Sequence, residues 1–243
     1  MAGVGGLRCA LIASYLAALL TVDTLVDARA QLVLGAATWI ALFLACRSVP
    51  PELRAQAVLV VVVATAAEIT GSLIWGVYTY RLENLPSFVP PGHGLVYLCG
   101  VALAGSMTRS RRALVGTALV LCLGWALAGL TVLPRTDVGG AVGAALLTIY
   151  LLRGRAPAIY AGVFLVVAAL ELYGTAIGTW TWAETIPGTG VPNGNPPSGV
   201  ASGYVWFDVI ALALAPKLLT VVRRARRSRG GPAPPLPDPA RSA

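Results

Sequence analysis

Residues 68–80 read EITGSLIWGVYTY, and residues 171–182 read ELYGTAIGTWTW. Each stretch begins with a glutamate inside an apolar run, carries a glycine three positions later, and ends in an aromatic–threonine–aromatic triplet. The same order of chemically different residues, present twice in one chain, indicates an internal duplication. We therefore expect Glu68 and Glu171 to occupy equivalent positions in two similar halves.

The correspondence between the halves extends beyond the two glutamates. With Glu68 placed on Glu171, Arg8 falls on Arg111. A one-residue gap and a few loop insertions extend the alignment toward the C-terminus. The further matches are Gly71 with Gly174, Ile74 with Ile177, Gly76 with Gly178, the triplet Tyr78-Thr79-Tyr80 with Trp180-Thr181-Trp182, Pro90-Pro91 with Pro196-Pro197, and residues 94–99 with 203–208.

The composition places the chain in a membrane. It is 57% hydrophobic and 12% charged, with a mean hydropathy of +0.77, which is not typical of a water-soluble domain. Crossing a bilayer takes about 20 apolar residues. Eight apolar segments begin near Leu7, Ala30, Ala55, His93, Arg112, Asp137, Pro157 and Gly203. The expected fold class is all-α, a polytopic bundle of about eight transmembrane helices that forms a single domain over residues 1–222.

The bundle is expected to consist of two parallel repeats of four helices, at about residues 7–107 and 111–222. An even number of helices returns the chain to the side from which it started, so both repeats have the same orientation. They are then related by an axis along the membrane normal, as in some transporters. Glu68 and Glu171 are expected at equal depth, in the outer half of the bilayer.

The distribution of arginine predicts the orientation. Positive charge gathers in every second connection and at the C-terminus, at Arg47, Arg54, Arg109, Arg111, Arg112, Arg153, Arg155, Arg223, Arg224, Arg226, Arg227 and Arg229. The alternate connections hold one arginine each, which are Arg29, Arg81 and Arg135. By the positive-inside rule, both termini are cytoplasmic in a multi-pass protein of the cell membrane. The net charge of +8 therefore reflects membrane topology, and no nucleic-acid partner is expected.

Residues 223–243 are basic and rich in proline, without apolar periodicity, so we expect a disordered cytoplasmic tail. Its arginines are expected to contact anionic lipid headgroups, and docking of a protein is the alternative. At the other end, Arg8 before an apolar run and a small-residue site at 28–30 imitate a signal peptide. We expect no cleavage, because the first helix has a counterpart in the second repeat.

Neither a metal nor a cofactor is expected. The four cysteines, Cys9, Cys46, Cys99 and Cys122, stand in apolar runs without a C-x-x-C pattern or a neighbouring histidine. No P-loop, zincin or nucleophile-elbow motif occurs, and no aspartate cluster is present that would hold magnesium and a diphosphate.

A carboxylate inside a membrane helix costs about 2.5–3.5 kcal/mol on insertion scales and marks a functional site by default. Two carboxylates at matched positions strengthen this interpretation for Glu68 and Glu171. The glycines on the same helix faces, Gly71 and Gly174, allow a neighbouring helix or a flat ligand to approach closely. The alternative is that the glutamates tie helices together and the glycines serve only close packing.

Further polar candidates lie near the motifs. His93, the only histidine, is either an interfacial hydrogen-bonding residue or a proton relay to Glu68. Asp208 stands where the first repeat has a cysteine, so it is a third candidate carboxylate, with Asn193 and Asn195 as neutral polar neighbours. The proline- and glycine-rich loops at 81–94 and 183–199 are expected to cap a cavity.

The aromatic residues suit the walls of a site for an unsaturated ligand or a developing carbocation, which aromatic faces stabilise. An interfacial aromatic belt is the alternative. The catalytic candidates are Glu68, Glu171, Asp208 and His93. The substrate-binding candidates are Trp75, Tyr78, Tyr80, Trp180, Trp182, Asn193, Asn195 and Tyr204.

At the two motifs the chain resembles the integral-membrane carotenoid biosynthesis family that includes carotenoid hydratases. The resemblance rests on E-x-x-G and G-V-Y-T-Y within residues 68–80, and on G-T-W-T-W and G-V-P-N-G-N-P-P-S-G within residues 178–199. In size, helix count and the placing of Glu68 and Asp208, the chain is also similar to small membrane-bound terpene cyclases.

Both resemblances imply protonation of an isoprenoid double bond by a carboxylic acid, followed by water capture or ring closure. Removal from water favours the neutral form of a carboxyl group, so at least one of Glu68 and Glu171 is expected to be the protonated acid. The expected partners are membrane lipids and an apolar, isoprenoid-like substrate. The alternatives are a small proton-coupled transporter with matched carboxylates and a non-catalytic membrane scaffold.

Overall fold

The computed structural model describes the backbone of residues 2–229 and the side chains of residues 4–225. Within this range the chain forms eight α-helices, and each begins within a few residues of its predicted start. They are α1 (Ala2–Asp23), α2 (Ala28–Arg47), α3 (Pro51–Glu68), α4 (Val89–Ser106), α5 (Arg111–Thr131), α6 (Val138–Arg153), α7 (Pro157–Ala176) and α8 (Ala201–Arg229). Six of them, α1, α2, α3, α5, α7 and α8, are long and apolar enough to cross a membrane, whereas α6 is apolar but shorter. The chain is therefore an all-helical, multi-pass membrane protein.

Large apolar side chains on the outside of the bundle fit this environment. Leu32, Ile40 and Leu44 of α2 are exposed, as are Val120 and Leu127 of α5. Contiguous apolar surfaces of this kind are rare on water-soluble monomers. Contact with lipid tails removes this surface from water.

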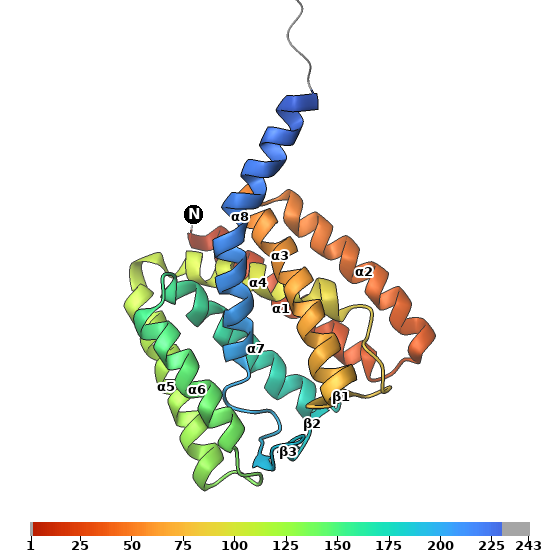
Figure 1. Cartoon of the computed structure of the whole chain (residues 1–243), viewed down its shortest axis with the longest axis vertical. Helices are drawn as coiled ribbons and strands as arrows, with labels where there is room; N and C mark the ends of the chain where they lie inside the picture. The colour runs from red at the N-terminus through yellow and green to blue at the C-terminus, as the bar shows by residue number, and fades with distance from the viewer. Residues whose placement is uncertain (1, 230–243) are drawn as a thin grey trace, which may run out of the picture.

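Helix α4 lies at the centre of the bundle (Figure 1). It contacts α1, α2, α3 and α7, and every residue from His93 to Gly100 is buried. A helix that is covered on all sides by protein has no lipid-facing surface to fill with long apolar side chains. This position explains how α4 can carry two prolines, several glycines and a histidine.

The helix contacts follow a two-fold pattern over most of the bundle. Helix α3 packs against α8 as α7 packs against α4, and α2 contacts α4 as α6 contacts α8. The exceptions are α1 and α5, because α1 packs along α4 and reaches α7, whereas α5 packs against α6 and α7. Helices α1 and α5 therefore depart from the two-fold pattern and pack against different neighbours.

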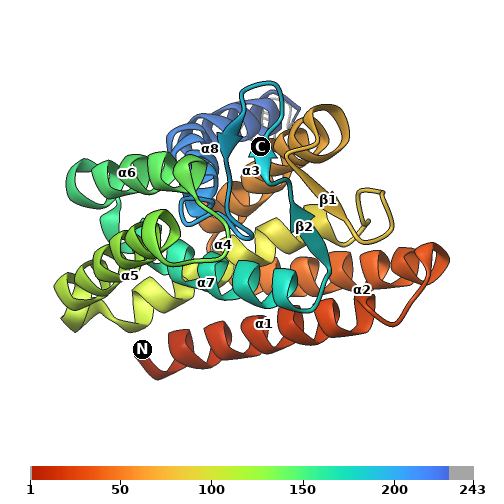
Figure 2. The ribbon, with the colours of Figure 1, turned by 90° about the horizontal axis from the view of Figure 1, so that it is seen from below.

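Two short strands join the halves at one end of the bundle. Strand β1 (Tyr78–Tyr80) follows α3, and β2 (Trp180–Trp182) follows α7; the two pair antiparallel (Figure 2). A second pair, β3 (Thr185–Ile186) and β4 (Val191–Pro192), forms a hairpin in the loop before α8. The arginine-rich connections lie at the opposite end of the helices.

A π-helical segment, η1 (Ile69–Trp75), lies between α3 and β1. A π-helical turn accommodates one extra residue in a helix. The segment coincides with the one-residue gap in the alignment of the two motifs, so it absorbs the extra residue of the first half. Both helices then end at glycines with left-handed backbone, Gly76 at φ 73° and Gly178 at φ 79°.

Helix α8 continues to Arg229 and projects beyond the rest of the bundle (Figure 1). Residues 223–229 are therefore helical, although the sequence patterns predict that the disordered tail begins at residue 223. Adding residues to an existing helix costs little, and arginine is a good helix former. The remainder of the predicted tail, residues 230–243, lies outside the described residues.

Candidate functional site

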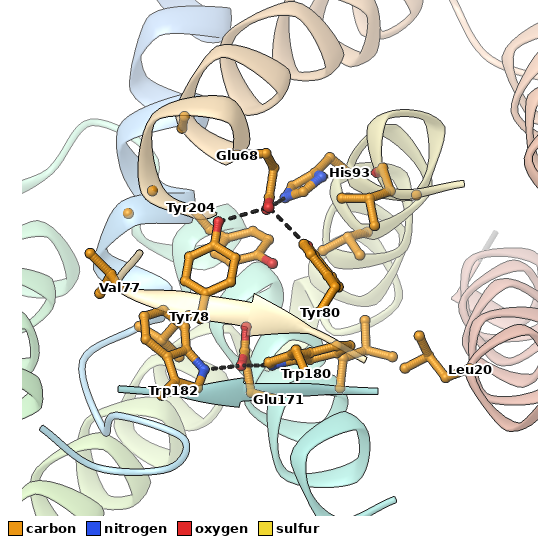
Figure 3. Close-up of a pocket in the computed structure, with 18 of the residues that line it drawn as sticks. Leu20, Glu68, Val77, Tyr78, Tyr80, His93, Glu171, Trp180, Trp182 and Tyr204 are labelled. Atoms are coloured by element: carbon orange, nitrogen blue, oxygen red, sulfur yellow. Dashed lines mark hydrogen bonds and ion pairs between the residues drawn. The ribbon is translucent and has the colours of Figure 1, made fainter. Parts of the chain in front are cut away.

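A cavity of about 290 Å³ lies at the end of the bundle where β1 and β2 pair (Figure 3). Its walls come from α1, α3, η1, α4, α7, α8 and both strands. Nine of the twelve candidate residues line it. These are Glu68, Trp75, Tyr78, Tyr80, His93, Glu171, Trp180, Trp182 and Tyr204. The two motifs therefore meet at one shared space, as the duplication predicts.

The Glu68 carboxylate is held by the aromatic triplet that follows it. Its Oε2 atom accepts hydrogen bonds from the hydroxyl groups of Tyr78 at 2.7 Å and Tyr80 at 2.8 Å. Glu68 is only 7% exposed, so these donors replace water. Because both hydroxyl groups donate to it, Oε2 acts only as an acceptor and carries no proton.

The Glu171 carboxylate is held by its own triplet in the corresponding way. Its Oε2 atom accepts hydrogen bonds from the indole Nε1 atoms of Trp180 at 2.9 Å and Trp182 at 3.1 Å. The side chain is 5% exposed, and its Oε1 atom has no hydrogen bond to any described residue. Figure 3 shows the two carboxyl groups entering the site from different helices, each with its two aromatic donors.

The glycines of the motifs make room for these aromatic rings. A Cβ atom on Gly174 would lie 2.1 Å from a ring carbon of Trp180, and a Cβ atom on Gly71 would lie 3.2 Å from a ring carbon of Tyr78. In the second half the ring can therefore fold back over the helix to reach the carboxylate only where a side chain is absent. In the first half a Cβ atom would make a tight contact, and Tyr78 would have to shift slightly. This contact accounts for the spacing E-x-x-G in both halves.

His93 adds a third partner to Glu68, in the first half only. Its Nε2 atom lies 3.2 Å from Glu68 Oε1, and its Nδ1 atom lies 3.0 Å from the carbonyl oxygen of Val89. A carbonyl oxygen only accepts, so Nδ1 carries a hydrogen. Nε2 then either donates to Glu68 as part of an imidazolium or accepts from a protonated Glu68. In both cases one proton is held between the two side chains.

Tyr204 of α8 covers the other side of this pair. Its ring stacks on His93 with 5.2 Å between the centroids, and Phe207 meets the histidine edge-on at 6.1 Å. The stacking fixes the plane of the imidazole and keeps water away from it. His93 is 6% exposed as a result.

The tyrosine donors remain protonated over a wide pH range. Burial, together with the neighbouring Glu68 carboxylate, raises the pKa of both Tyr78 and Tyr80 well above the ordinary phenol value. Both hydroxyl groups therefore act as donors at any physiological pH.

Asp208 does not line the cavity. It is 1% exposed, and its Oδ2 atom has no hydrogen-bond partner within the described part of the chain. It lies one helical turn beyond Tyr204, toward the arginine-rich end. Tyr97 and Tyr160 are close enough to interact with it electrostatically, and Tyr97 donates a hydrogen bond to Gln56 at 2.8 Å. Asp208 thus belongs to a separate buried polar cluster next to the site.

The two asparagines hold the loop between β2 and α8 and do not contact Asp208. Asn195 Oδ1 accepts a hydrogen bond from the backbone N–H of Trp182 at 3.0 Å, and Asn193 donates to the carbonyl oxygen of Ala183 at 3.3 Å. Trp75 lines the cavity and also donates to the carbonyl oxygen of Pro187, at 3.0 Å. These contacts fix the loop between β2 and α8 beside the site.

Asp137 has a role in holding the loop near the site that the sequence does not reveal. It caps α6 by accepting from the N–H of Gly140, and it also accepts from the N–H of Gly194 and from both N–H and Oγ of Ser198. The pattern before an apolar helix predicts an N-cap. Only the tertiary structure shows that the same carboxylate anchors the loop over residues 193–198.

The apolar wall contributed by α1 was also not predicted. Leu16, Leu19 and Leu20 line the cavity. Their spacing places them on one helix face, but the whole of α1 is apolar, so the sequence does not distinguish a cavity-facing side from a lipid-facing side.

Among the described residues, no three His, Cys, Asp or Glu side chains lie close enough together to hold a metal ion. Comparison with family models, with curated proteins and with solved structures finds no match to this chain.

Proposed function

We propose that the protein is an integral membrane enzyme that protonates a double bond at one end of a polyisoprenoid or carotenoid-like lipid, as a hydratase or a cyclase does. The observation that carries this proposal is that two buried carboxyl groups, each held by two aromatic donors, line the same small apolar cavity. Such a site supplies an acid, a base and aromatic faces within a space from which water is largely excluded.

The two carboxyl groups have different surroundings, which gives them different roles in the proposal. Glu68 has three donors and shares a proton with His93, so it is the base and the anion that faces a developing cation. Glu171 contacts no cationic side chain in the described part of the chain, and its free Oε1 atom carries the proton that is donated. Two titratable groups with diverging environments are a common basis of acid–base assignment.

The reaction follows from these roles. The proton on Glu171 is transferred to one carbon of the double bond, and the positive charge at the other carbon is stabilised by Glu68 and by the faces of Tyr78 and Trp182. In a hydratase, water adds to the cation and its proton passes to the Glu68–His93 pair. In a cyclase, a second double bond of the same chain attacks the cation, and a neighbouring carbon loses the proton to that pair.

The size of the cavity supports a long substrate of which only one end is bound. Ligand pockets are commonly about 300–1,000 Å³, and the volume of about 290 Å³ holds a terminal group and not a whole polyisoprenoid. The remainder of the chain would lie in the bilayer, against the exposed indole of Trp75, which is 51% exposed.

We further propose that the chain spans the cell membrane eight times as two parallel repeats of four helices, with both termini cytoplasmic and the cavity toward the outside. The two-fold contacts of α2, α3 and α4 with α6, α7 and α8 support the repeats. The arginines, which gather at the end opposite to β1 and β2, support the orientation.

A proton-coupled transporter is the second candidate, because one observation also favours it. The two glutamates are related by the same two-fold pattern as the helices, and paired carboxylates between parallel repeats are natural in carriers. In this case the proton held between Glu68 and His93 is the coupled ion.

Mass spectrometry of lipid extracts distinguishes these functions. Cells that express the intact protein are compared with cells that express Glu68→Gln, Glu171→Gln or Glu52→Gln, the last being a control on an exposed residue of α3. We expect an isoprenoid product, one water heavier or isomeric, that is lost in the two site variants and retained in the control. Unchanged isoprenoid and pigment profiles, together with a lost proton or solute flux, would contradict the enzyme and support the transporter. Loss of folded protein in both site variants would favour a scaffold.

A further inference from the structure

A second cavity lies at the arginine-rich end of the bundle, opposite to the site described above. Its volume is about 710 Å³, and its walls come from the end of α4, the start of α5, the last turn of α6 and the start of α7. Helices α4 and α7 each line both cavities, but with their opposite ends. The two cavities are therefore separated by the length of these helices.

The rim of this cavity is positively charged. Arg111, Arg112 and Arg155 contribute to the lining, and none of its described residues is an aspartate or glutamate. All three side chains are exposed. No hydrogen bond or ion pair joins any of the three guanidinium groups to another described residue, so their donors remain available to a ligand.

The walls below the rim are apolar. Val101, Val115, Leu119 and Ile159 are among the residues that line the cavity. Two glycines, Gly105 and Gly116, also face it, and a Cβ atom added to either would meet nothing within 4 Å. The glycines thus leave open space between α4 and α5 and do not serve close packing of these helices.

The first half of the chain packs differently at the corresponding arginine. Arg8 corresponds to Arg111 in sequence, but its guanidinium group donates to the carbonyl oxygen of Ser48 at 3.1 Å. Helix α1 packs along α4, so closely that a Cβ atom on Gly5 would lie 3.0 Å from the carbonyl oxygen of Ala102. The cavity therefore results from the different placement of α5, which packs on α6 and α7 instead.

We propose that this cavity, bounded by Arg111, Arg112 and Arg155, binds one anionic phospholipid. The phosphate group accepts hydrogen bonds from the guanidinium groups, which suit phosphate oxygens geometrically, and an acyl chain enters the apolar space between α4 and α5. Basic pockets between transmembrane helices at the cytoplasmic surface recognise anionic headgroups in this way. This site is independent of the chemistry at Glu68 and Glu171.

The test measures lipid retained by the purified protein. The full chain in neutral detergent is mixed with phosphatidylglycerol or phosphatidylcholine, and the bound lipid is counted by native mass spectrometry. We expect one phosphatidylglycerol per chain and no retained phosphatidylcholine. Arg111→Gln, Arg112→Gln and Arg155→Gln together should lower retention by about tenfold or more, since each arginine near the surface contributes to anionic lipid binding.

A second variant removes the space and keeps the charge. Gly116→Leu fills the cavity, whereas Gly6→Leu adds the same side chain on α1, where a Cβ atom also meets nothing within 4 Å. We expect loss of the lipid in Gly116→Leu and full retention in Gly6→Leu. The proposal is overturned if phosphatidylcholine binds equally well, if the triple arginine variant and Gly116→Leu retain the lipid, or if millimolar inorganic phosphate displaces it.

Discussion

Thr79 of β1 lies directly opposite Thr181 of β2 in the antiparallel pair that joins the two halves of the chain. Around this point the aromatic residues exchange places, so that Tyr78 faces Trp182 and Tyr80 faces Trp180. The two residues are equivalents in the sequence alignment, which places a local two-fold axis between them. Each strand directs its aromatic side chains at the carboxylate of its own half, and main-chain pairing therefore holds both carboxylates at one cavity.

The glycine three residues after each glutamate is expected to be essential in the second half and less so in the first. Gly174→Ala places a Cβ atom 2.1 Å from Trp180, whereas in Gly71→Ala the distance to Tyr78 is 3.2 Å. We expect Gly174→Ala to lower the free energy of unfolding by about 1–3 kcal/mol, as overpacking does, and Gly71→Ala to lower it by less. Thermal unfolding in detergent measures both.

Gly124→Ala is the matched control for these glycine variants. It lies within α5, and a Cβ atom there meets nothing within 4 Å. Alanine is a better helix former than glycine, so stability should be unchanged or slightly higher. A Gly174→Ala protein as stable as Gly124→Ala would show that Trp180 does not fold back over α7.

Asp137 is expected to be the main support of the loop between β2 and α8. Asp137→Ala removes a buried acceptor of four hydrogen bonds. We therefore expect the free energy of unfolding to fall by about 3 kcal/mol or more. The matched control is Asp27→Ala, which removes an exposed N-cap with one such bond, to Ala30, at a cost of about 1 kcal/mol.

Limited proteolysis adds a second measurement for this prediction. Cleavage within residues 184–198 should become faster in Asp137→Ala and stay unchanged in Asp27→Ala. Equal stability and equal cleavage in the two variants would mean that the loop is held without Asp137.

The tyrosines that bind Glu68 should make the protein sensitive to alkali. Their pKa values are raised by burial and by Glu68, so in the folded protein they keep protons that an unfolded phenol loses near pH 10. Their contribution to stability is therefore constant below about pH 10 and falls as the pH rises further. The combined Tyr78→Phe and Tyr80→Phe variant should show a shallower alkaline decline in unfolding free energy. Identical pH profiles would contradict the hydrogen bonds to Glu68.

Cys9 and Cys99 provide a test of the contact between α1 and α4. Their Sγ atoms are 3.1 Å apart, and a disulfide requires about 2.0 Å, so a small movement suffices. Mild oxidation should produce one intramolecular crosslink, found by mass spectrometry of proteolytic peptides and absent in Cys9→Ser. The absence of a crosslink in a chain that retains Cys9 would contradict the packing of α1 on α4, and with it the leucine wall of the cavity.

The sequence alone was sufficient to predict where the helices begin and which residues of the two motifs line the cavity. Apolar run length fixes where helices form, because each run must satisfy its own backbone hydrogen bonds in lipid. The repeated order of Glu, Gly and aromatic residues identified Glu68, Glu171 and both triplets, since a chain rarely preserves such a pattern twice. These signals are local, so they are readable one segment at a time.

Only the tertiary structure decided which donors reach which acceptors. It paired His93 with Glu68, assigned the tyrosine hydroxyl groups and the tryptophan indoles to separate carboxylates, and left Asp208 outside the cavity. It also placed α1 and α5 differently, although the alignment of the two motifs predicts that they correspond. Nearly every helix here is apolar on all sides, and helical periodicity therefore does not encode which face meets a neighbour, a cavity or lipid. That choice is made by close packing between segments far apart in the chain.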